Sequence, residues 1–180
     1  GWNSETQFPL IQGADCCGVV IKAADKDTQT LVGKRVLIRP CTTIKNQYGD
    51  NSSVWMGSDF NGSFANFLSI SASEAFQISS NLTNEELASI PCTFGTAENM
   101  LTRARVTDKH HLLITGGSGG VGRALIQLAK VRGAKVTAIS SGEKCHLVKA
   151  FGCEEVFDRT APDSIFLEHI KKAENSFDII

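Results

Sequence analysis

The sequence predicts an α/β protein in which a doubly wound parallel sheet follows a β-rich unit. The hydrophobic pattern changes near residue 80, from short strand-like runs to strands that alternate with helices. In the second part, a glycine-rich turn at residues 116–122 joins a buried strand to a helix. These observations divide the chain into residues 1–80 and residues 81–180.

Residues 1–80 predict strands and turns without a helix. Runs of apolar and β-branched residues bounded by Gly, Asp and Pro are typical of strands, and three such runs lie at residues 17–23, 35–39 and 64–70. Residues 42–61, between the second and third runs, are rich in Asn, Ser, Gly and Asp, which predicts a long surface loop. The first part is therefore expected to be a small all-β unit.

Residues 81–180 predict alternating helices and strands. Thr83 and Glu86 form an S/T-x-x-E capping box in front of an apolar run, which indicates the start of a helix. Alternation of strands and helices with short connections implies a parallel sheet with crossover helices. We expect helices at residues 84–90, 96–104, 120–132, 143–151 and 162–173, and strands at residues 111–115, 135–140, 155–157 and 177–180.

Composition and charge are those of a soluble globular protein. Of the 180 residues, 42% are apolar and 21% are charged, and the formal net charge is −1. This balance gives no electrostatic reason to bind nucleic acid or an anionic membrane. No apolar run approaches the ~20 residues of a spanning helix. We therefore expect no nucleic-acid partner and no membrane partner.

The cysteine pattern predicts an intracellular, reducing environment. None of the six cysteines belongs to a C-x-x-C pair, and their spacing fits neither a zinc ribbon nor a compact disulfide framework. We interpret them as reduced, mostly buried thiols, which predicts a cytoplasmic location. The cysteines lie at positions 16, 17, 41, 92, 145 and 153.

The glycine-rich turn is the strongest functional signal. It fits G-x-G-x-x-G between a strand and a helix, the setting in which this motif binds a dinucleotide. In this interpretation Gly117 allows the tight turn, Gly119 lets the backbone approach a pyrophosphate, and Gly122 lets helix and strand pack closely. Free N–H groups and the positive end of the helix dipole then face the phosphates. The predicted cofactor-binding residues here are Gly117, Ser118, Gly119, Gly120, Val121 and Gly122.

Three other interpretations of the turn are open. A turn without a ligand is the simplest, although clustered glycines at a helix start cost conformational entropy. Gly116, Ser118 and Gly120 also spell the G-x-S-x-G nucleophile elbow of α/β-hydrolases. That elbow needs a downstream histidine, here His146 or His169, both on predicted helices. The turn also fits T-G-x-x-x-G-x-G of short-chain dehydrogenases, but no tyrosine follows it to form their Tyr-x-x-x-Lys pair.

Several segments share the order and spacing of one superfamily. Residues 12–20 are similar to G-x-[DE]-x-x-G-x-V, residues 32–36 to V-G-[DE]-R-V, and residues 62–67 to G-[GS]-[FY]-A-E-[YF]. Residues 90–97 are similar to the helix link in front of the nucleotide turn at residues 115–122. On these segments the chain resembles the medium-chain dehydrogenase/reductase superfamily, which includes zinc alcohol dehydrogenases and quinone oxidoreductases.

The resemblance implies a GroES-like β-rich catalytic domain over residues 1–80 and a Rossmann domain over residues 81–180, with substrate and nicotinamide meeting in the cleft. It also implies that the start of the first domain and the end of the second are absent, as a beginning at Gly1 and an apolar ending at residues 177–180 suggest. Homodimers are common in the superfamily, through strands that would lie beyond Ile180.

The resemblance favours the zinc-free branch of the superfamily. The zinc branch places a metal-ligating histidine where this chain has Ala14, and its structural zinc needs four closely spaced cysteines in a loop that here holds only Cys41. Cys92 matches the position of a catalytic zinc ligand, but one thiolate does not complete a tetrahedral site. We therefore expect no zinc and interpret Cys92 as a small buried apolar residue.

The residues after the second strand of the nucleotide unit favour NADPH over NADH. NAD-preferring sites end this strand with an Asp or Glu that binds the ribose 2′-OH, and such an acid would repel a 2′-phosphate. Here the strand ends in Ser140 and Ser141, and Lys144 follows, a set of donors that suits a 2′-phosphate. Glu143 leaves the other choice open, because a different loop path would bring its carboxylate to the ribose.

These inferences predict an NADPH-dependent oxidoreductase that reduces a carbonyl, a quinone or an activated alkene, with a small molecule as its substrate. The cofactor carries the hydride chemistry, so the protein supplies position and polarisation. Thr96 matches a superfamily position near the nicotinamide, whereas the catalytic residues stay unassigned. Two alternatives stay open: a zinc-dependent alcohol dehydrogenase with unusual ligands, and a regulatory protein that binds NADP(H) without turnover.

Overall fold

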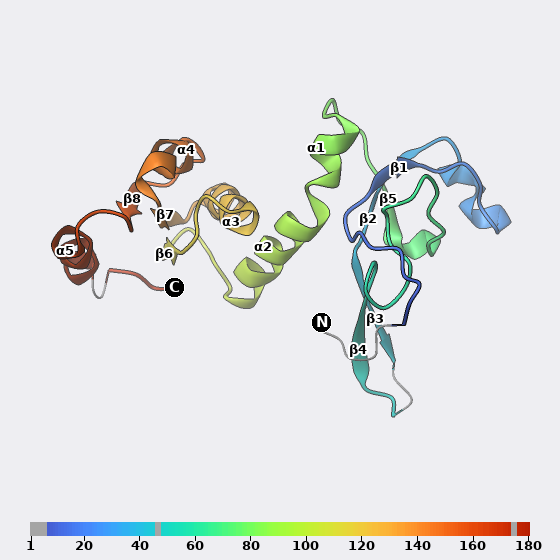
Figure 1. Cartoon of the computed structure of the whole chain (residues 1–180), viewed down its shortest axis with the longest axis horizontal. Helices are drawn as coiled ribbons and strands as arrows, with labels where there is room; N and C mark the ends of the chain where they lie inside the picture. The colour runs from blue at the N-terminus through green and yellow to red at the C-terminus, as the bar shows by residue number, and fades with distance from the viewer. Residues whose placement is uncertain (1–6, 46–47, 174–175) are drawn as a thin grey trace. The chain divides into compact units, whose positions relative to one another are not determined.

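The computed structural model describes residues 7–45, 48–173 and 176–180 (Figure 1). The chain divides into two compact units, residues 1–92 and residues 93–180. The first unit is β-rich and the second alternates strands with helices. The predicted fold class is therefore confirmed, while the predicted domain boundary after residue 80 stays a prediction.

The first unit contains an antiparallel sheet in the order β1-β2-β5. Successive side chains of a strand point to opposite faces, so Val36 and Ile38 share one face of the central strand. Both are buried, at 3% and 4% exposure, and they pack with Met56. The predicted strand at 35–39 is confirmed, and the one at 17–23 is shorter than predicted. The strands are β1 (Cys17–Val19), β2 (Arg35–Ile38) and β5 (Ala75–Gln77), and short 3-10 turns lie at Lys26–Leu31 and Ala72–Glu74.

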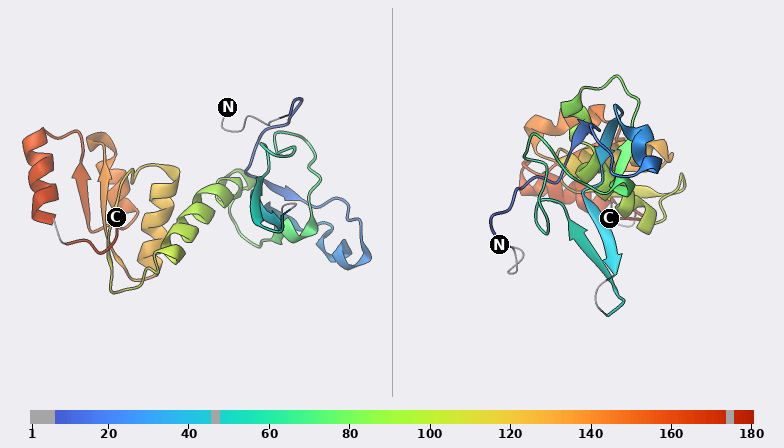
Figure 2. Two further views of the ribbon diagram at one scale, coloured as in Figure 1. Left: turned by 90° about the horizontal axis from the view of Figure 1, so that it is seen from below. Right: turned by 90° about the vertical axis from the view of Figure 1, so that its right-hand side faces the viewer.

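The predicted surface loop at residues 42–61 is wrong, because most of it is an antiparallel hairpin. Strand β3 (Cys41–Lys45) pairs with β4 (Asn51–Trp55), and Thr43 lies opposite Ser53. Hydroxyl-bearing residues pair well across strands, so a stretch whose composition suits a loop also forms a ladder. The hairpin extends away from the three-stranded sheet (Figures 1 and 2).

The predicted strand at residues 64–70 is also wrong. This segment has no strand pairing, and the side chains of Phe64 and Phe67 are 77% and 76% exposed. Its first residues are tied instead to a neighbouring loop, since the Phe64 N–H donates to the Gln12 carbonyl at 2.9 Å. The start of this run thus contacts the loop around Gly13 without joining a sheet.

The helices begin close to their predicted starts, with one exception. The capping box is confirmed, because Thr83 Oγ1 accepts from the Glu86 N–H and Glu86 accepts from the Thr83 N–H. Helix α2 starts five residues earlier than predicted, at Pro91, a residue whose fixed φ and missing N–H suit the first turn of a helix. The helices are α1 (Asn84–Ala88), α2 (Pro91–Arg103), α3 (Gly120–Val131), α4 (Cys145–Ala150) and α5 (Asp163–Ala173), with a 3-10 turn η3 at Gly142–Lys144.

The second unit is built on a parallel sheet in the order β6-β7-β8. On the other side of β6, Ile179 forms a parallel bridge to Leu112, so the chain returns across the sheet after α5. This reversal of strand order defines a doubly wound sheet, and ligands bind outside the carboxyl ends of the strands at the reversal. The strands are β6 (His111–Ile114), β7 (Lys135–Ser140) and β8 (Glu155–Asp158).

Helices flank this sheet, with α3 and α5 on opposite sides of the strands (Figure 2). The three residues of β6 that follow His111 are all buried, as expected for a strand covered on both faces. Helix α3 buries Leu125, Ile126 and Ala129, whose spacing places them on one face of the helix, toward the sheet. Within the residues that the structure describes, no helix has both the length and the apolar character needed to cross a bilayer.

Candidate dinucleotide site

The glycine turn lies at the carboxyl end of β6, where the sheet reverses. Gly116 adopts a φ of +62°, the left-handed conformation that glycine reaches at little cost. Its carbonyl accepts the Gly119 N–H at 2.9 Å, which closes the turn. The tight turn was assigned to Gly117 from the motif; this role belongs to Gly116.

Gly117 has a different function in the turn, because it is buried between β7 and α4. A Cβ at this position would lie 3.0 Å from Ala138 Cβ and 3.2 Å from Val148 Cγ1. Its N–H donates to the Ile139 carbonyl at 3.0 Å, which ties the turn to the neighbouring strand. The absence of a side chain at Gly117 therefore keeps the turn close to β7.

Gly122 allows the first turn of α3 to approach the strand end, as predicted from the motif. A Cβ here would lie only 2.3 Å from the Gly116 carbonyl oxygen and 2.9 Å from Gly117 Cα. The first residues of a helix have N–H groups without intrahelical partners. In α3 these belong to Gly120, Val121 and Gly122, and the helix dipole adds positive potential at the same place. This end of α3 therefore suits an anionic diphosphate.

One residue of α2 contacts the turn, and the sequence analysis missed it. A Cβ on Gly120 would lie 2.8 Å from Thr93 Cγ2, so the Thr93 methyl group lies against the start of α3. Thr96 lies almost one helical turn further along α2 and is exposed. Its predicted place beside a nicotinamide stays a prediction.

The second predicted part of the site follows β7. Ser140 is buried, with 2% of its surface exposed, and its hydroxyl has no hydrogen-bond partner in the part of the chain that the structure describes. Buried polar groups are normally paired, so this hydroxyl fits a ligand or a water at the end of β7. Ser141 is half-buried at the start of η3, and Lys144 is exposed.

An acid also reaches this edge, from the neighbouring strand. Asp158 ends β8 and lies opposite Ser140 in the register of the sheet. Its Oδ2 atom lies 2.5 Å from the place where a Cβ of Gly142 would be. Sequence reasoning missed it because it considered only the acids that follow β7. A parallel register brings the ends of adjacent strands together, although these two residues are far apart in the chain.

Cys92 lies at the start of α2 and is linked to a loop of the first unit. Its N–H donates to Asp15 Oδ1 at 2.8 Å, which caps the helix with a carboxylate. Burial, followed by the negative charge of Asp15, raises the pKa of the Cys92 thiol and disfavours the thiolate that zinc requires. The described residues contain no group of three or more metal-ligating side chains. The zinc content of the whole protein stays a prediction.

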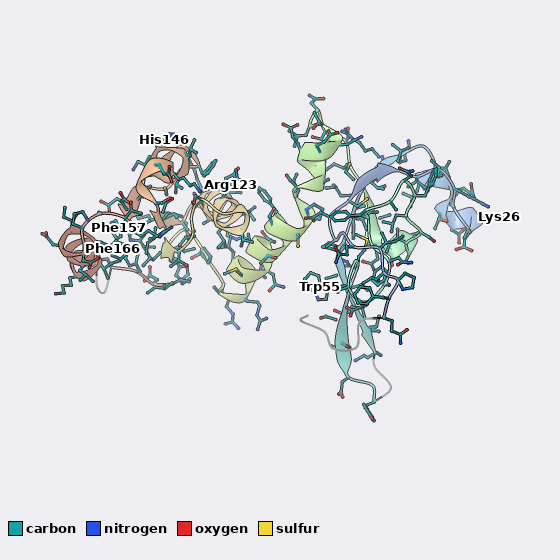
Figure 3. All side chains as sticks on the ribbon, in the orientation of Figure 1. Lys26, Trp55, Arg123, His146, Phe157 and Phe166 are labelled. Carbon is teal, nitrogen blue, oxygen red and sulfur yellow. The ribbon has the colours of Figure 1, made fainter. Side chains whose placement is uncertain are left out.

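Among the described residues, His146 does not support the nucleophile-elbow interpretation of Ser118. His146 lies on α4 two residues before Val148, the residue that contacts Gly117, and residues two apart do not share a helix face. Figure 3 shows His146 on the outer side of α4. The side chain of His169 lies outside the described residues.

Comparison with known families and proteins agrees with this geometry. Residues 1–80 match the family described as alcohol dehydrogenase GroES-like domain, and residues 120–180 match the family described as zinc-binding dehydrogenase. An alcohol dehydrogenase of Schizosaccharomyces pombe is 28% identical over 184 residues, which cover 97% of this chain and 52% of that protein. A 2-methylene-furan-3-one reductase of Solanum lycopersicum is 30% identical over 180 residues, covering 98% and 42%.

A similar solved structure extends over both units. A candidate alcohol dehydrogenase of Sinorhizobium meliloti 1021 superposes with a TM-score of 0.84 and 32% identity, covering 99% of this chain and 50% of that one. The chain thus spans about half the length of the relatives that it matches. The similarity includes the β-rich part, the glycine turn and the parallel sheet.

Proposed function

Because the chain belongs to the medium-chain dehydrogenase/reductase superfamily, as its sequence motifs predicted, we propose that the protein is an NADPH-dependent oxidoreductase. It reduces a carbonyl, a quinone or an activated alkene. The observation that supports this most directly is the start of α3, where glycines expose main-chain N–H groups beside a tight turn. The predicted extents of its GroES-like and Rossmann domains, residues 1–80 and 81–180, belong to the same proposal.

The turn holds the diphosphate of the nicotinamide cofactor through main-chain donors. Gly120, Val121 and Gly122 provide the amides, and the close packing at Gly117 and Gly122 leaves the phosphates room to approach. When bound, the nicotinamide supplies the hydride. Thr96 orients the ring, and the protein excludes water and positions the small-molecule substrate.

The donors after β7 support a preference for NADPH. The Ser141 hydroxyl and the Lys144 ammonium bind the 2′-phosphate, and a charge-assisted contact of this kind is stronger than a neutral hydrogen bond. The Ser140 hydroxyl, which has no hydrogen-bond partner among the described residues, lies deeper at the same strand end. Its burial indicates that it contacts the ribose side of the site, and not the exposed phosphate that the sequence analysis assigned to it.

An activated alkene is the substrate that one of the named relatives, the reductase of Solanum lycopersicum, favours. The tomato relative is named for a methylene-furanone, which contains an alkene conjugated to a carbonyl. Reduction of such a substrate needs no metal when a donor group polarises the carbonyl. We propose that the protein works without catalytic zinc, since Ala14 has no ligand atom in its side chain and Asp15 already binds the start of α2. We also propose a cytoplasmic location and a homodimer.

Titration of the purified protein with each nicotinamide cofactor tests the proposal. We expect Lys144→Ala to raise the Kd for NADPH by about tenfold to a hundredfold, since a hydrogen bond to a charged group contributes about 1.5–3 kcal/mol. The Kd for NADH should change less than about twofold, because NADH lacks the 2′-phosphate. Cofactor fluorescence reports both constants.

Lys135→Ala is the matched control, because Lys135 is an exposed lysine at the opposite end of β7. Equal weakening of both cofactors by Lys144→Ala would refute the NADPH assignment. NADPH binding without turnover on a panel of quinones, enones and aldehydes would favour a regulatory protein. Stoichiometric zinc in the active protein, found by metal analysis, would favour the zinc-dependent alternative.

A further inference from the structure

The loop proposed to hold the 2′-phosphate has a negatively charged neighbour. Asp158 Oδ2 lies 2.5 Å from the Cβ position of Gly142, so the carboxylate is in van der Waals contact with that glycine. Gly142 follows Ser141 directly and begins η3, which ends at Lys144. The carboxylate of β8 therefore lies against the middle of the loop that contains both proposed phosphate ligands.

Asp158 is held in this place by several contacts. Its Oδ1 atom accepts the Thr160 N–H at 2.8 Å and the Thr160 hydroxyl at 2.6 Å. The Gly142 N–H donates to Thr160 Oγ1 at 3.2 Å, and the Arg159 N–H donates to the Ser140 carbonyl at 2.9 Å. The loops after β7 and β8 are thus joined, and the carboxylate cannot move away from Gly142 without breaking these bonds.

The carboxylate stays ionised at neutral pH. Hydrogen bonds from Thr160, with smaller contributions from the Gly142 N–H and the charge of Arg159, hold the pKa of Asp158 below its ordinary value. The two linked loops contain three other charged residues. Glu143 and Lys144 belong to η3, and Arg159 follows Asp158 directly. Lys144, Glu143 and Arg159 are exposed, whereas Asp158 is partly covered.

We propose that Asp158 weakens binding of the 2′-phosphate and so sets the degree to which the protein prefers NADPH over NADH. This inference rests on the proposed function, because it concerns the same cofactor site. The sequence argument for NADPH was that β7 ends without an acid. In the folded chain β8 supplies one, which opposes Lys144 at the same loop.

The expected effect of Asp158 on the Kd for NADPH follows from the distance between its carboxylate and the proposed phosphate ligands. Adjacent Cα atoms are about 3.8 Å apart, so the carboxylate lies within about 10 Å of the Ser141 hydroxyl. Like charges repel weakly over such a distance in water and more strongly near a protein surface. With a doubly charged phosphate, this corresponds to a change of about threefold to tenfold in Kd.

The test is a titration of Asp158→Asn with NADPH and NADH at low and high salt. The asparagine keeps an oxygen that accepts from Thr160 but removes the charge. We expect the Kd for NADPH to fall by about threefold to tenfold, with the Kd for NADH changing less than about twofold. The gain should shrink in high salt, because exposed charges are screened over a Debye length of about 3 Å at 1 M.

Two variants separate charge from structure. Asp158→Glu keeps the charge and should bind NADPH within about twofold of the unchanged protein. Glu155→Gln removes an equal charge at the other end of β8, about 10 Å along the strand, and should leave both constants unchanged. Circular dichroism confirms that each variant is folded.

Each result has a defined meaning. An unchanged NADPH constant in a folded Asp158→Asn variant, or equal changes for both cofactors, would overturn the role of Asp158 while leaving the proposed function intact. Failure of the unchanged protein to bind either cofactor would instead overturn the proposed function, and the inference with it.

Discussion

The two units of this chain differ in how completely they bury their apolar side chains. In the unit of residues 93–180, fourteen buried residues among those that the structure describes form one cluster between the helices and the parallel sheet. In the unit of residues 1–92, the corresponding cluster holds three, Val36, Ile38 and Met56. The first unit also has a hollow of about 330 Å³ beside Arg39 and Glu74.

This difference has a physical source in the two kinds of sheet. A parallel sheet covered by helices buries both faces of its strands, and so its core is continuous. The short antiparallel strands of the first unit bury one face, and Phe64 and Phe67 remain largely exposed beside them. We infer that the second unit provides a rigid base for the cofactor. The smaller core of the first unit contributes less to the free energy of unfolding.

Cavity-forming substitutions in the two cores give the largest expected effect. Ile126 is 0% exposed and Met56 is 1% exposed. We expect Ile126→Ala to lower the free energy of unfolding of its unit by about 4 kcal/mol, since a densely packed core relaxes little around a cavity. Met56→Ala should cost about 2 kcal/mol, because the smaller core can collapse more readily.

The two units can be followed separately in urea. Both tryptophans lie in residues 1–92, and Trp55 is on β4 (Figure 3), so tryptophan fluorescence follows the first unit. Far-UV circular dichroism follows mainly the helices of the second. Equal costs for Ile126→Ala and Met56→Ala would contradict the difference in packing.

A glycine substitution tests the rigid base at the cofactor turn. In Gly122→Ala the new methyl group would meet the Gly116 carbonyl, so we expect a loss of about 3 kcal/mol from overpacking and loss of NADPH binding. Gly95→Ala is the control, because a Cβ on this residue of α2 has no atom within 4 Å. Alanine there should stabilise the helix by about 0.5–1 kcal/mol. Unchanged stability and binding in Gly122→Ala would show that the turn is not tightly packed.

An ion pair in which only the carboxylate is buried gives the smallest expected effect and concerns the first unit. Glu74 is buried and accepts from Arg39 Nε at 2.6 Å and from Arg39 Nη2 at 3.0 Å. The hydrogen bonds from Arg39 hold the pKa of Glu74 below its ordinary value of 4.5, although burial opposes them. We expect Glu74→Gln to cost about 1–2 kcal/mol at neutral pH, because Arg39 is half-exposed.

The pH dependence of this pair has a definite sign. A carboxyl group with a lowered pKa in the folded state contributes stability above its unfolded pKa, and that stability is lost as the pH falls through the folded pKa. The difference between the unchanged protein and Glu74→Gln should therefore be full above pH 4.5 and disappear at lower pH. Urea unfolding followed by tryptophan fluorescence measures it. A difference that persists in acid would exclude the ion pair as its cause.

The sequence predicted the second unit well because its signals are local. A strand, a glycine turn and a helix follow one another, so the site at Gly122 could be located from spacing alone. The role of Gly117 could not, because it depends on contacts with β7 and α4, and the motif spacing did not reveal that the positive φ of the tight turn belongs to Gly116. Asp158 was missed for the same reason, since only the pairing of β7 with β8 brings it to the loop.

The first unit was predicted less accurately because its signals are ambiguous. Threonine, serine and asparagine suit both a loop and a cross-strand ladder, and only the partner strand decides between them, as Thr43 and Ser53 illustrate. The apolar run at residues 64–70 shows the opposite error, a strand that is predicted but does not form. Its local pattern predicts a strand, but no neighbouring strand pairs with it. Extended segments need long-range partners that composition does not reveal.

The bridge between Leu112 and Ile179 has a consequence for self-association. The Leu113 N–H donates to the Ile179 carbonyl at 2.9 Å, and the Asp178 N–H donates to the His111 carbonyl at the same distance. Residues 177–180 therefore occupy an edge of β6 that would otherwise offer unpaired main-chain groups next to a fully apolar run. Open edges of this kind serve as templates for aggregation. Proteolytic cleavage in front of residue 177 that released this segment would expose such a template in the best-packed sheet of the chain.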